Sequence, residues 1–105
     1  MLEMESTFVA GEGWKWSNPR IIPFQELILN PFNSSLHYSV QCFEGMKAYK
    51  DGAGKIRLFR PMCNMKRFYS SSNRLALPGF DGEELIKCME ELIKVETRWL
   101  SLIHI

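Results

Sequence analysis

The four residues Asp51-Gly52-Ala53-Gly54 restrict the possible folds of this chain more than any other feature. Both glycines tolerate positive φ angles, so the segment predicts a tight turn. Residues 43–50 before it alternate as a half-buried strand does, and residues 56–59 after it read Ile-Arg-Leu-Phe, which favours a return strand. We therefore predict an antiparallel hairpin. The faces of its first strand carry Glu44, Met46 and Ala48 on one side, and Phe43, Lys47 and Tyr49 on the other.

Two helices are expected after the hairpin. Pro61 suits the first position of a helix, where the missing N–H costs nothing, and that helix should run to about Leu75. Asp81 is a good N-cap for a second helix, and Glu84 three residues later is close to a capping box. The apolar stripe of this second helix follows helical spacing. It consists of Leu85, Cys88, Met89, Leu92 and Ile93.

Upstream of residue 43 the signals are weaker. Residues 1–13 show no clear period, and the glycines and prolines up to Pro19 indicate loops or turns. Residues 20–24 favour a short edge strand or extended segment, because Pro23 cannot donate to a ladder. Ser34 or Ser35 is expected to cap a short helical turn through Tyr38. These elements predict an α+β fold, a small antiparallel sheet with flanking helices.

Composition excludes several classes of partner. The chain has 105 residues, enough for one small domain, and is 46% hydrophobic and 24% charged with a net charge of +1. We therefore expect no nucleic-acid partner and no membrane association. Its cysteines are odd in number and far apart, which indicates reduced thiols and no metal site. The acidic N-terminus does not resemble a secretion signal, so the protein is not expected to be secreted.

The residues alone carry little recognisable chemistry. His37 could act as an acid or base, but a structural hydrogen bond is the preferred interpretation. Arg60 and Arg67 lie seven residues apart and could share a helix face, with Arg57 on the preceding strand. Such arginines could bind phosphate or a carboxylate through paired donors. A solvated face is the preferred interpretation without further information.

Several strings together resemble a known family. They are Ser34 to Ser39, Phe43-Glu44-Gly45-Met46-Lys47-Ala48-Tyr49, Arg57-Leu58-Phe59-Arg60-Pro61, Asn64-Met65 with Arg67, and Leu77-Pro78 with Phe80-Asp81. This combination resembles the branched-chain amino acid aminotransferases, which are fold-type-IV pyridoxal-phosphate enzymes. The resemblance covers about residues 13–99. It implies that residues 1–99 are an incomplete N-terminal small domain of a two-domain protein.

The resemblance implies roles for three residues. Arg67 matches the arginine that binds the phosphate of pyridoxal 5'-phosphate, a task suited to a guanidinium. Tyr38 and Phe43 match aromatic residues of the substrate side-chain pocket, where an aliphatic side chain needs an apolar wall. The catalytic lysine of the family lies in the following large domain. No catalytic residue is therefore assigned here, and no lysine of this chain is nominated in its place.

Two departures from the family pattern stand near these residues. Lys66 replaces a usually acidic residue beside Arg67, which could alter an ion pair there. The Gly13–Pro19 stretch carries extra residues, among them Trp16.

The complete enzyme implied by the resemblance would be a homodimer. It would exchange the amino group of Leu, Ile or Val with 2-oxoglutarate, the substrates being branched-chain amino acids and 2-oxo acids. We expect the present chain alone to be inactive. One alternative is a non-enzymatic α+β module derived from this fold, and another is a D-amino acid aminotransferase or a lyase of the same fold. Family members are cytoplasmic or mitochondrial, and the sequence does not choose between these compartments.

The last six residues, 100–105, break the pattern. They are apolar and lack the cap or turn expected after Trp99. We interpret them as a non-native tail read through from an adapter sequence.

Overall fold

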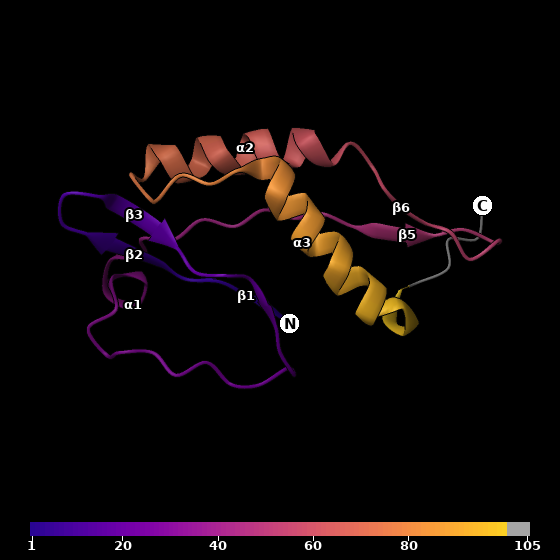
Figure 1. The fold of residues 1–105 in the computed structure, drawn as a ribbon, viewed down its shortest axis with the longest axis horizontal. Coiled ribbons are helices and arrows are strands. Elements are labelled where there is room, and N and C mark those ends of the chain that lie inside the picture. The colour runs from indigo at the N-terminus through magenta and orange to yellow at the C-terminus, as the bar shows by residue number, and fades with distance from the viewer. Residues whose placement is uncertain (101–105) are drawn as a thin grey trace.

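The computed structural model describes residues 1–100 as an open, elongated arrangement. The principal extents are 50 × 29 × 25 Å and the radius of gyration is 16.0 Å, whereas a compact domain of this length has about 13 Å. Helices α2 (Pro61–Arg74) and α3 (Gly82–Val95) cross near the middle, with strand pairs toward opposite ends (Figure 1). Apart from Leu100, the predicted non-native tail lies outside the described residues.

The strands form three antiparallel pairs, so the α+β class is confirmed. The ladders are separate, whereas a single small sheet was predicted. The pairs are β1 (Leu2–Glu3) with β4 (Arg20–Ile21), β2 (Ser6–Val9) with β3 (Gly13–Trp16), and β5 (Ala48–Lys50) with β6 (Ile56–Leu58).

The predicted hairpin at Asp51–Gly54 is confirmed. The Asp51 carboxylate accepts hydrogen bonds from the backbone N–H groups of Ala53 (3.0 Å) and Lys55 (2.8 Å), and Gly54 has a φ of 83°. These bonds satisfy donors that the turn would otherwise leave open. The hairpin therefore owes its register to one aspartate and one glycine.

The first strand of this hairpin is shorter than predicted, since residues 43–47 are outside any ladder. The register pairs Ala48 with Leu58, which would place Met46 opposite Arg60. Arg60 has a left-handed φ of 49° and precedes the helix that begins at Pro61. Residues 43–47 consequently have no strand to pair with, although their side chains still alternate between half-buried and exposed.

The N-terminal region is more ordered than its sequence indicated. Strands β1, β2 and β3 lie where no clear period or a loop was predicted. The β2–β3 turn uses Gly11 at φ 82° and Gly13 at φ 83°, so the glycines mark a hairpin. Both of these strands are largely exposed, and a strand without a buried face has no strong alternation to detect.

The helix boundaries follow the predictions closely, with two differences at the caps. Asn33, and neither Ser34 nor Ser35, caps α1 (Ser34–Tyr38) by accepting a hydrogen bond from the Ser35 N–H at 2.8 Å. Asp81 caps α3 as predicted, accepting from the N–H groups of Glu83 and Glu84. The side chain of Glu84 does not close a capping box, because its carboxylate accepts from Lys87 at 2.8 Å. A 3₁₀ turn, η1 (Thr97–Trp99), follows α3.

The core of residues 1–100 is small and lies where α2 meets α3. Met65 and Ile86 retain 3% and 9% of their accessible surface, and Ser72 is also buried. The predicted stripe on α3 is half-buried but omitted Ile86, its one fully buried residue. Gly82 permits the close approach, because a Cβ there would lie 2.9 Å from the Cβ of Met65. A small residue at the start of α3 thus sets the distance between the helices.

A second long-range contact links the N-terminal hairpin to the helices. The indole N–H of Trp16 on β3 donates to the carbonyl oxygen of Gly79 in the α2–α3 loop at 2.7 Å. Trp16 belongs to the Gly13–Pro19 stretch, which was singled out from the sequence as carrying extra residues. Its hydrogen bond gives the β2–β3 hairpin a fixed attachment.

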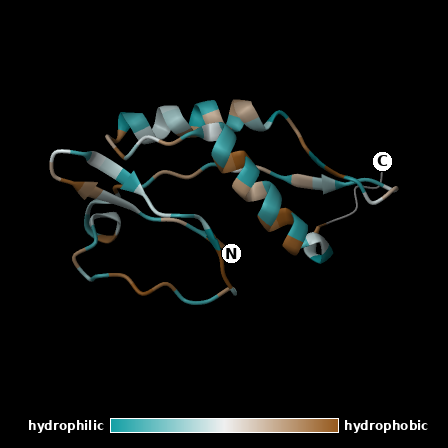
Figure 2. Ribbon diagram, viewed as in Figure 1, coloured by the Kyte–Doolittle hydropathy of each residue, from teal (hydrophilic) through white to brown (hydrophobic). Residues whose placement is uncertain are grey.

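Large apolar side chains are exposed over much of the chain. Figure 2 shows apolar colour along the loop between β4 and α1 and on α3. The exposed set includes Phe24, Leu27, Ile28, Phe32, Leu36, Phe43, Phe59 and Trp99. Among residues 1–100, no helix is both long and apolar enough to cross a membrane.

Replacing Gly82 by alanine should destabilise the protein. The added methyl would press on the Met65 Cβ, which sits next to the backbone and cannot move cheaply; overpacking of this kind costs about 1–3 kcal/mol. Urea unfolding followed by circular dichroism measures the loss. Gly52→Ala is the matched control, because a methyl there meets nothing within 4 Å. Equal effects of the two substitutions would contradict this packing account.

The purified chain should also bind a hydrophobic dye and associate at high concentration. Contiguous exposed apolar surface is rare on stable monomers, and this chain exposes many aromatic and aliphatic side chains. Fluorescence of anilinonaphthalene sulfonate, together with sedimentation over a range of concentrations, tests this expectation. A monodisperse monomer that does not increase the fluorescence of the dye would show that the apolar side chains are covered in solution.

Candidate functional site

The candidate site forms where residues 43–47 pass the first turns of α2. Glu44 belongs to the half-buried face of this extended segment, and its side chain retains 7% of its accessible surface. Asn64 and Arg67 lie three residues apart on α2 and therefore share a helix face. Arg67 is much more open, with a side chain that is 67% exposed. A nearly buried carboxylate thus meets an exposed guanidinium.

Two hydrogen bonds hold Arg67 to Glu44. The Nε–H of Arg67 donates to Glu44 Oε2 at 2.7 Å, and Nη2 donates to Oε1. This is the bidentate geometry in which a guanidinium and a carboxylate align in parallel. Because both bonds use the Nε/Nη2 edge, the Nη1 side of the guanidinium is not engaged by Glu44.

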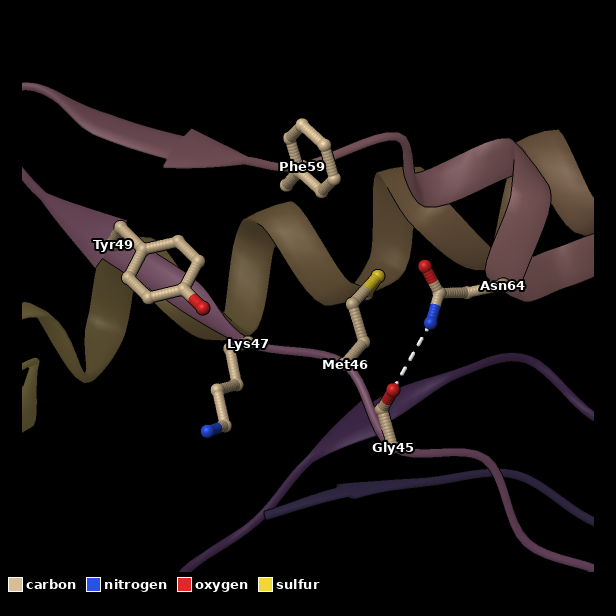
Figure 3. Close-up of a pocket in the computed structure, with 6 residues that line it drawn as sticks. All are labelled: Gly45, Met46, Lys47, Tyr49, Phe59 and Asn64. Atoms are coloured by element: carbon tan, nitrogen blue, oxygen red, sulfur yellow. Dashed lines mark hydrogen bonds between the residues drawn. The ribbon is translucent and has the colours of Figure 1, made fainter.

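Asn64 braces the carboxylate from α2. Its Nδ2 donates to Glu44 Oε1 at 3.1 Å and to the carbonyl oxygen of Gly45 at 2.9 Å. The second bond is drawn in Figure 3. One amide therefore satisfies both the side chain of Glu44 and the backbone of the next residue, which fixes a segment that has no ladder partner.

The ion pair has a large effect on the acidity of Glu44. Its hydrogen bonds with Arg67 lower the pKa of the Glu44 carboxyl from 4.5 to about 2, against the opposing effect of burial. The hydrogen bond from Asn64 acts in the same direction as Arg67. Glu44 in turn raises the pKa of Arg67. The pair is fully charged at every physiological pH.

An open hollow of about 440 Å³ adjoins the pair. Figure 3 shows Met46 turned toward Phe59 and Asn64, while Lys47 points the other way. Its walls are mostly apolar, and Lys47, Tyr49 and Asn64 are the lining residues with polar side chains. The lining residues are Gly45, Met46, Lys47, Tyr49, Phe59 and Asn64.

The three site residues predicted from the sequence lie on three different segments of the structure. Arg67 is in the Glu44 pair. Tyr38 ends α1 and is 81% exposed, and Phe43 precedes Glu44 and is 91% exposed. Neither aromatic side chain lines the hollow. The proposed roles of Arg67, Tyr38 and Phe43 remain predictions.

The other arginines do not join Arg67. Arg60 sits before α2 with a left-handed backbone, so it does not share a helical face with Arg67. Arg57 lies 3.5 Å from the Asp51 carboxylate at the hairpin turn. The arginines of this region are therefore distributed over separate local interactions, and a joint anion site formed by all of them is not observed.

Sequence reasoning missed the importance of Glu44 and Asn64. Glu44 was assigned only to one face of a predicted strand and to a matching string, and Asn64 entered only as part of another matching string. One signal was present, because Asn64 and Arg67 stand at i and i+3 on a predicted helix. Their common partner was not detectable, since Glu44 lies 20 residues before Asn64.

Metal ligands and thiols are the other candidate groups in residues 1–100. No three His, Cys, Asp or Glu residues gather there in a group that could hold a metal ion. Cys42, Cys63 and Cys88 are free thiols. The fold and hydrogen bonds thus define a small α+β unit that displays a fixed guanidinium, a group suited to binding carboxylates or phosphates.

Comparison with known proteins finds relatives of this chain. The chain is 54% identical over 85 residues, 81% of its length, to the mitochondrial branched-chain-amino-acid aminotransferase of Mus musculus, and 49% identical over the same share to the cytosolic enzyme of Ovis aries. It is 44% identical over 100 residues, 95% of its length, to the branched-chain-amino-acid aminotransferase of Dictyostelium discoideum. No protein-family model matches. The chain is homologous to one part of the branched-chain-amino-acid aminotransferases.

The shared part is a minor share of these relatives. The match spans 22% of the mouse and sheep proteins and 25% of the Dictyostelium protein. The relatives include both mitochondrial and cytosolic forms.

Glu44 should titrate far below an ordinary glutamate. The pKa of about 2 predicts that the ¹³Cδ resonance of Glu44 keeps its ionised position as the pH falls through 4.5. A carboxyl with a lowered folded pKa stabilises the protein fully above its unfolded value and loses this contribution as the pH falls toward 2. The stability difference between wild type and Glu44→Gln should therefore be constant above pH 5 and shrink below pH 4.5.

The matched control for this titration is Glu12→Gln, which removes a carboxylate from an exposed contact of 3.8 Å with Lys15. We expect that variant to leave the pH profile nearly unchanged, as is usual for surface ion pairs. A Glu44 midpoint near 4.5 would show that the pair with Arg67 does not persist in solution.

Proposed function

We propose that this chain forms part of the cofactor and substrate site of a pyridoxal-phosphate-dependent branched-chain aminotransferase. The reaction would move the amino group of Leu, Ile or Val to 2-oxoglutarate. The observation that supports this most directly is the 44–54% identity to enzymes of that name, joined to a fixed and exposed Arg67 at a position matching the family's phosphate-binding arginine. The catalytic lysine and most other site residues would come from the part of the enzyme that corresponds to the unmatched portion of the relatives.

The donor set of Arg67 fits a phosphate group. A guanidinium carries paired N–H donors on more than one edge, and Glu44 uses the Nε/Nη2 edge. Apart from its bonds to Glu44, the guanidinium makes no hydrogen bond among residues 1–100, and the Arg67 side chain as a whole is 67% exposed. A phosphate dianion can accept two parallel hydrogen bonds at the Nη1/Nη2 end. Pyridoxal phosphate, when bound, supplies a ring that stabilises the negative charge left after the substrate loses its α-proton.

Phe43 and Tyr38 are proposed to form an apolar wall for the substrate side chain. Phe43 directly precedes Glu44 and is 91% exposed. Because successive side chains of an extended segment point to opposite faces, its ring lies on the face opposite the Glu44–Arg67 pair. An exposed ring is costly in water, and contact with an aliphatic side chain removes apolar surface from solvent at about 25 cal/mol per Å². Rigid rings lose little entropy on binding, which suits them to this task.

The assembly and compartment belong to the same proposal. We infer a homodimeric parent enzyme, located in mitochondria or cytosol like the relatives named above. The apolar side chains exposed by this chain would then be covered by the rest of the enzyme. Alone, the chain should not catalyse transamination.

A chimeric enzyme tests this proposal. The 85 matched residues of this chain should replace the corresponding part of the Mus musculus relative, and transamination of leucine with 2-oxoglutarate should be retained. Arg67→Ala in that chimera should weaken pyridoxal phosphate binding by about ten- to a hundredfold, the loss of a charge-assisted pair. Cofactor fluorescence measures this affinity independently of turnover.

Control measurements sharpen the result. Arg57→Ala removes a neighbouring arginine that pairs with Asp51, so it should leave cofactor affinity unchanged. D-leucine should not be a substrate of the chimera. A well-folded chimera that accepts only D-amino acids would overturn the proposal. So would a chimera whose cofactor affinity is unchanged by Arg67→Ala, and so would transamination by the 105-residue chain alone.

A further inference from the structure

The guanidinium of Arg67 has an unusual combination of freedom and restraint. Its side chain is 67% exposed, yet Nε and Nη2 are both held by one carboxylate whose side chain retains 7% of its accessible surface. Long exposed arginines ordinarily sample many rotamers, and fixing one of them on binding weakens the affinity for the ligand. Here the restraint exists before any ligand arrives.

The restraint extends from the helix to the neighbouring chain segment. Asn64 donates to Glu44 at 3.1 Å and to the Gly45 carbonyl at 2.9 Å. Because residues 43–47 lack a ladder partner, these bonds are the polar contacts that locate Glu44 relative to α2. Glu44 cannot move without breaking its bonds to both Asn64 and Arg67.

The negative charge of Glu44 allows its effect on the orientation of Arg67 to be distinguished from its effect on electrostatic attraction. A carboxylate beside an anion-binding arginine weakens the attraction of that arginine for phosphate if charge alone matters. Keeping a nearly buried acid at this position therefore needs a compensating benefit. Orientation of the guanidinium supplies one, because bidentate recognition of phosphate depends on the plane of the donors.

We propose that Glu44, braced by Asn64, is a positioning residue that fixes the guanidinium of Arg67 so that its Nη1/Nη2 end receives the phosphate of the cofactor. This inference rests on the proposed function. It goes beyond it in assigning a role to two residues that do not touch the phosphate. The two possible effects of Glu44, orientation and charge, predict opposite outcomes when its charge is removed.

The test uses the full 105-residue chain, labelled with ¹⁵N, and inorganic phosphate as the probe. The Nε–H resonance of Arg67 reports directly on the pair, and its shift during titration gives the phosphate affinity. Glu44→Gln should bind phosphate about two- to tenfold more weakly than wild type, because the arginine must then be ordered on binding. Glu44→Asp keeps the charge but shortens the reach, and it should weaken binding in the same way.

Asp51→Asn is the matched control, since it removes the charge from the other carboxylate–arginine pair of this region; it should not weaken phosphate binding at Arg67. Asn64→Ala removes the brace without touching the ion pair. We expect a smaller loss of affinity from it, and it carries the test if Glu44→Gln does not fold.

The outcomes separate the inference from the proposed function. Unchanged or tighter phosphate binding by folded Glu44→Gln would overturn the positioning role and leave the phosphate role of Arg67 intact. Wild-type binding that survives Arg67→Ala, or no binding at Arg67 at all, would overturn both. Weaker binding by Glu44→Gln and Glu44→Asp, with Asp51→Asn unaffected, is the result that the inference requires.

Discussion

The bidentate pair between Glu44 and Arg67 joins two segments that no β-ladder connects. Residues 43–47 run alongside α2 without a strand partner, because the chain turns into the helix directly after β6. The pair and the Asn64 brace replace the missing ladder with side-chain bonds. The hollow beside them is therefore shaped by polar contacts on one side and by the β5–β6 hairpin on the other.

Apart from this ion pair, few buried contacts stabilise the protein. Among residues 1–100 the buried apolar side chains are Met65 and Ile86, where α2 and α3 cross, and Gly82 permits that crossing. The Trp16 bond to Gly79 attaches the N-terminal hairpin from outside this core. A unit with so little buried apolar surface relies on local caps, turns and ion pairs. This is consistent with a match to about a quarter or less of each relative named above.

Local signals in the sequence predicted local structure well. The Asp51–Gly54 turn, the start of α2 at Pro61 and the Asp81 cap each depend on one or two residues with strong backbone preferences, and each was confirmed. Strands β2 and β3 were missed because largely exposed strands lack a buried face, and β1 was missed because its two residues are too few to show a period. Asn33 was missed as the α1 cap because two serines beside it are equally good caps. Only part of the candidate site could be predicted. The family resemblance indicated Arg67, whereas the contact between Glu44 and α2 is a tertiary interaction that residue spacing does not predict.

The central claim is that Glu44 and Arg67 act as one unit that ties residues 43–47 to α2. A double-mutant cycle with Glu44→Gln and Arg67→Ala, measured by urea unfolding at neutral pH, tests it most directly. We predict that the two substitutions are not additive, and that the double variant loses clearly less stability than the sum of the single losses. Additive losses within experimental error would contradict the claim, because they would show that the two residues stabilise the protein independently.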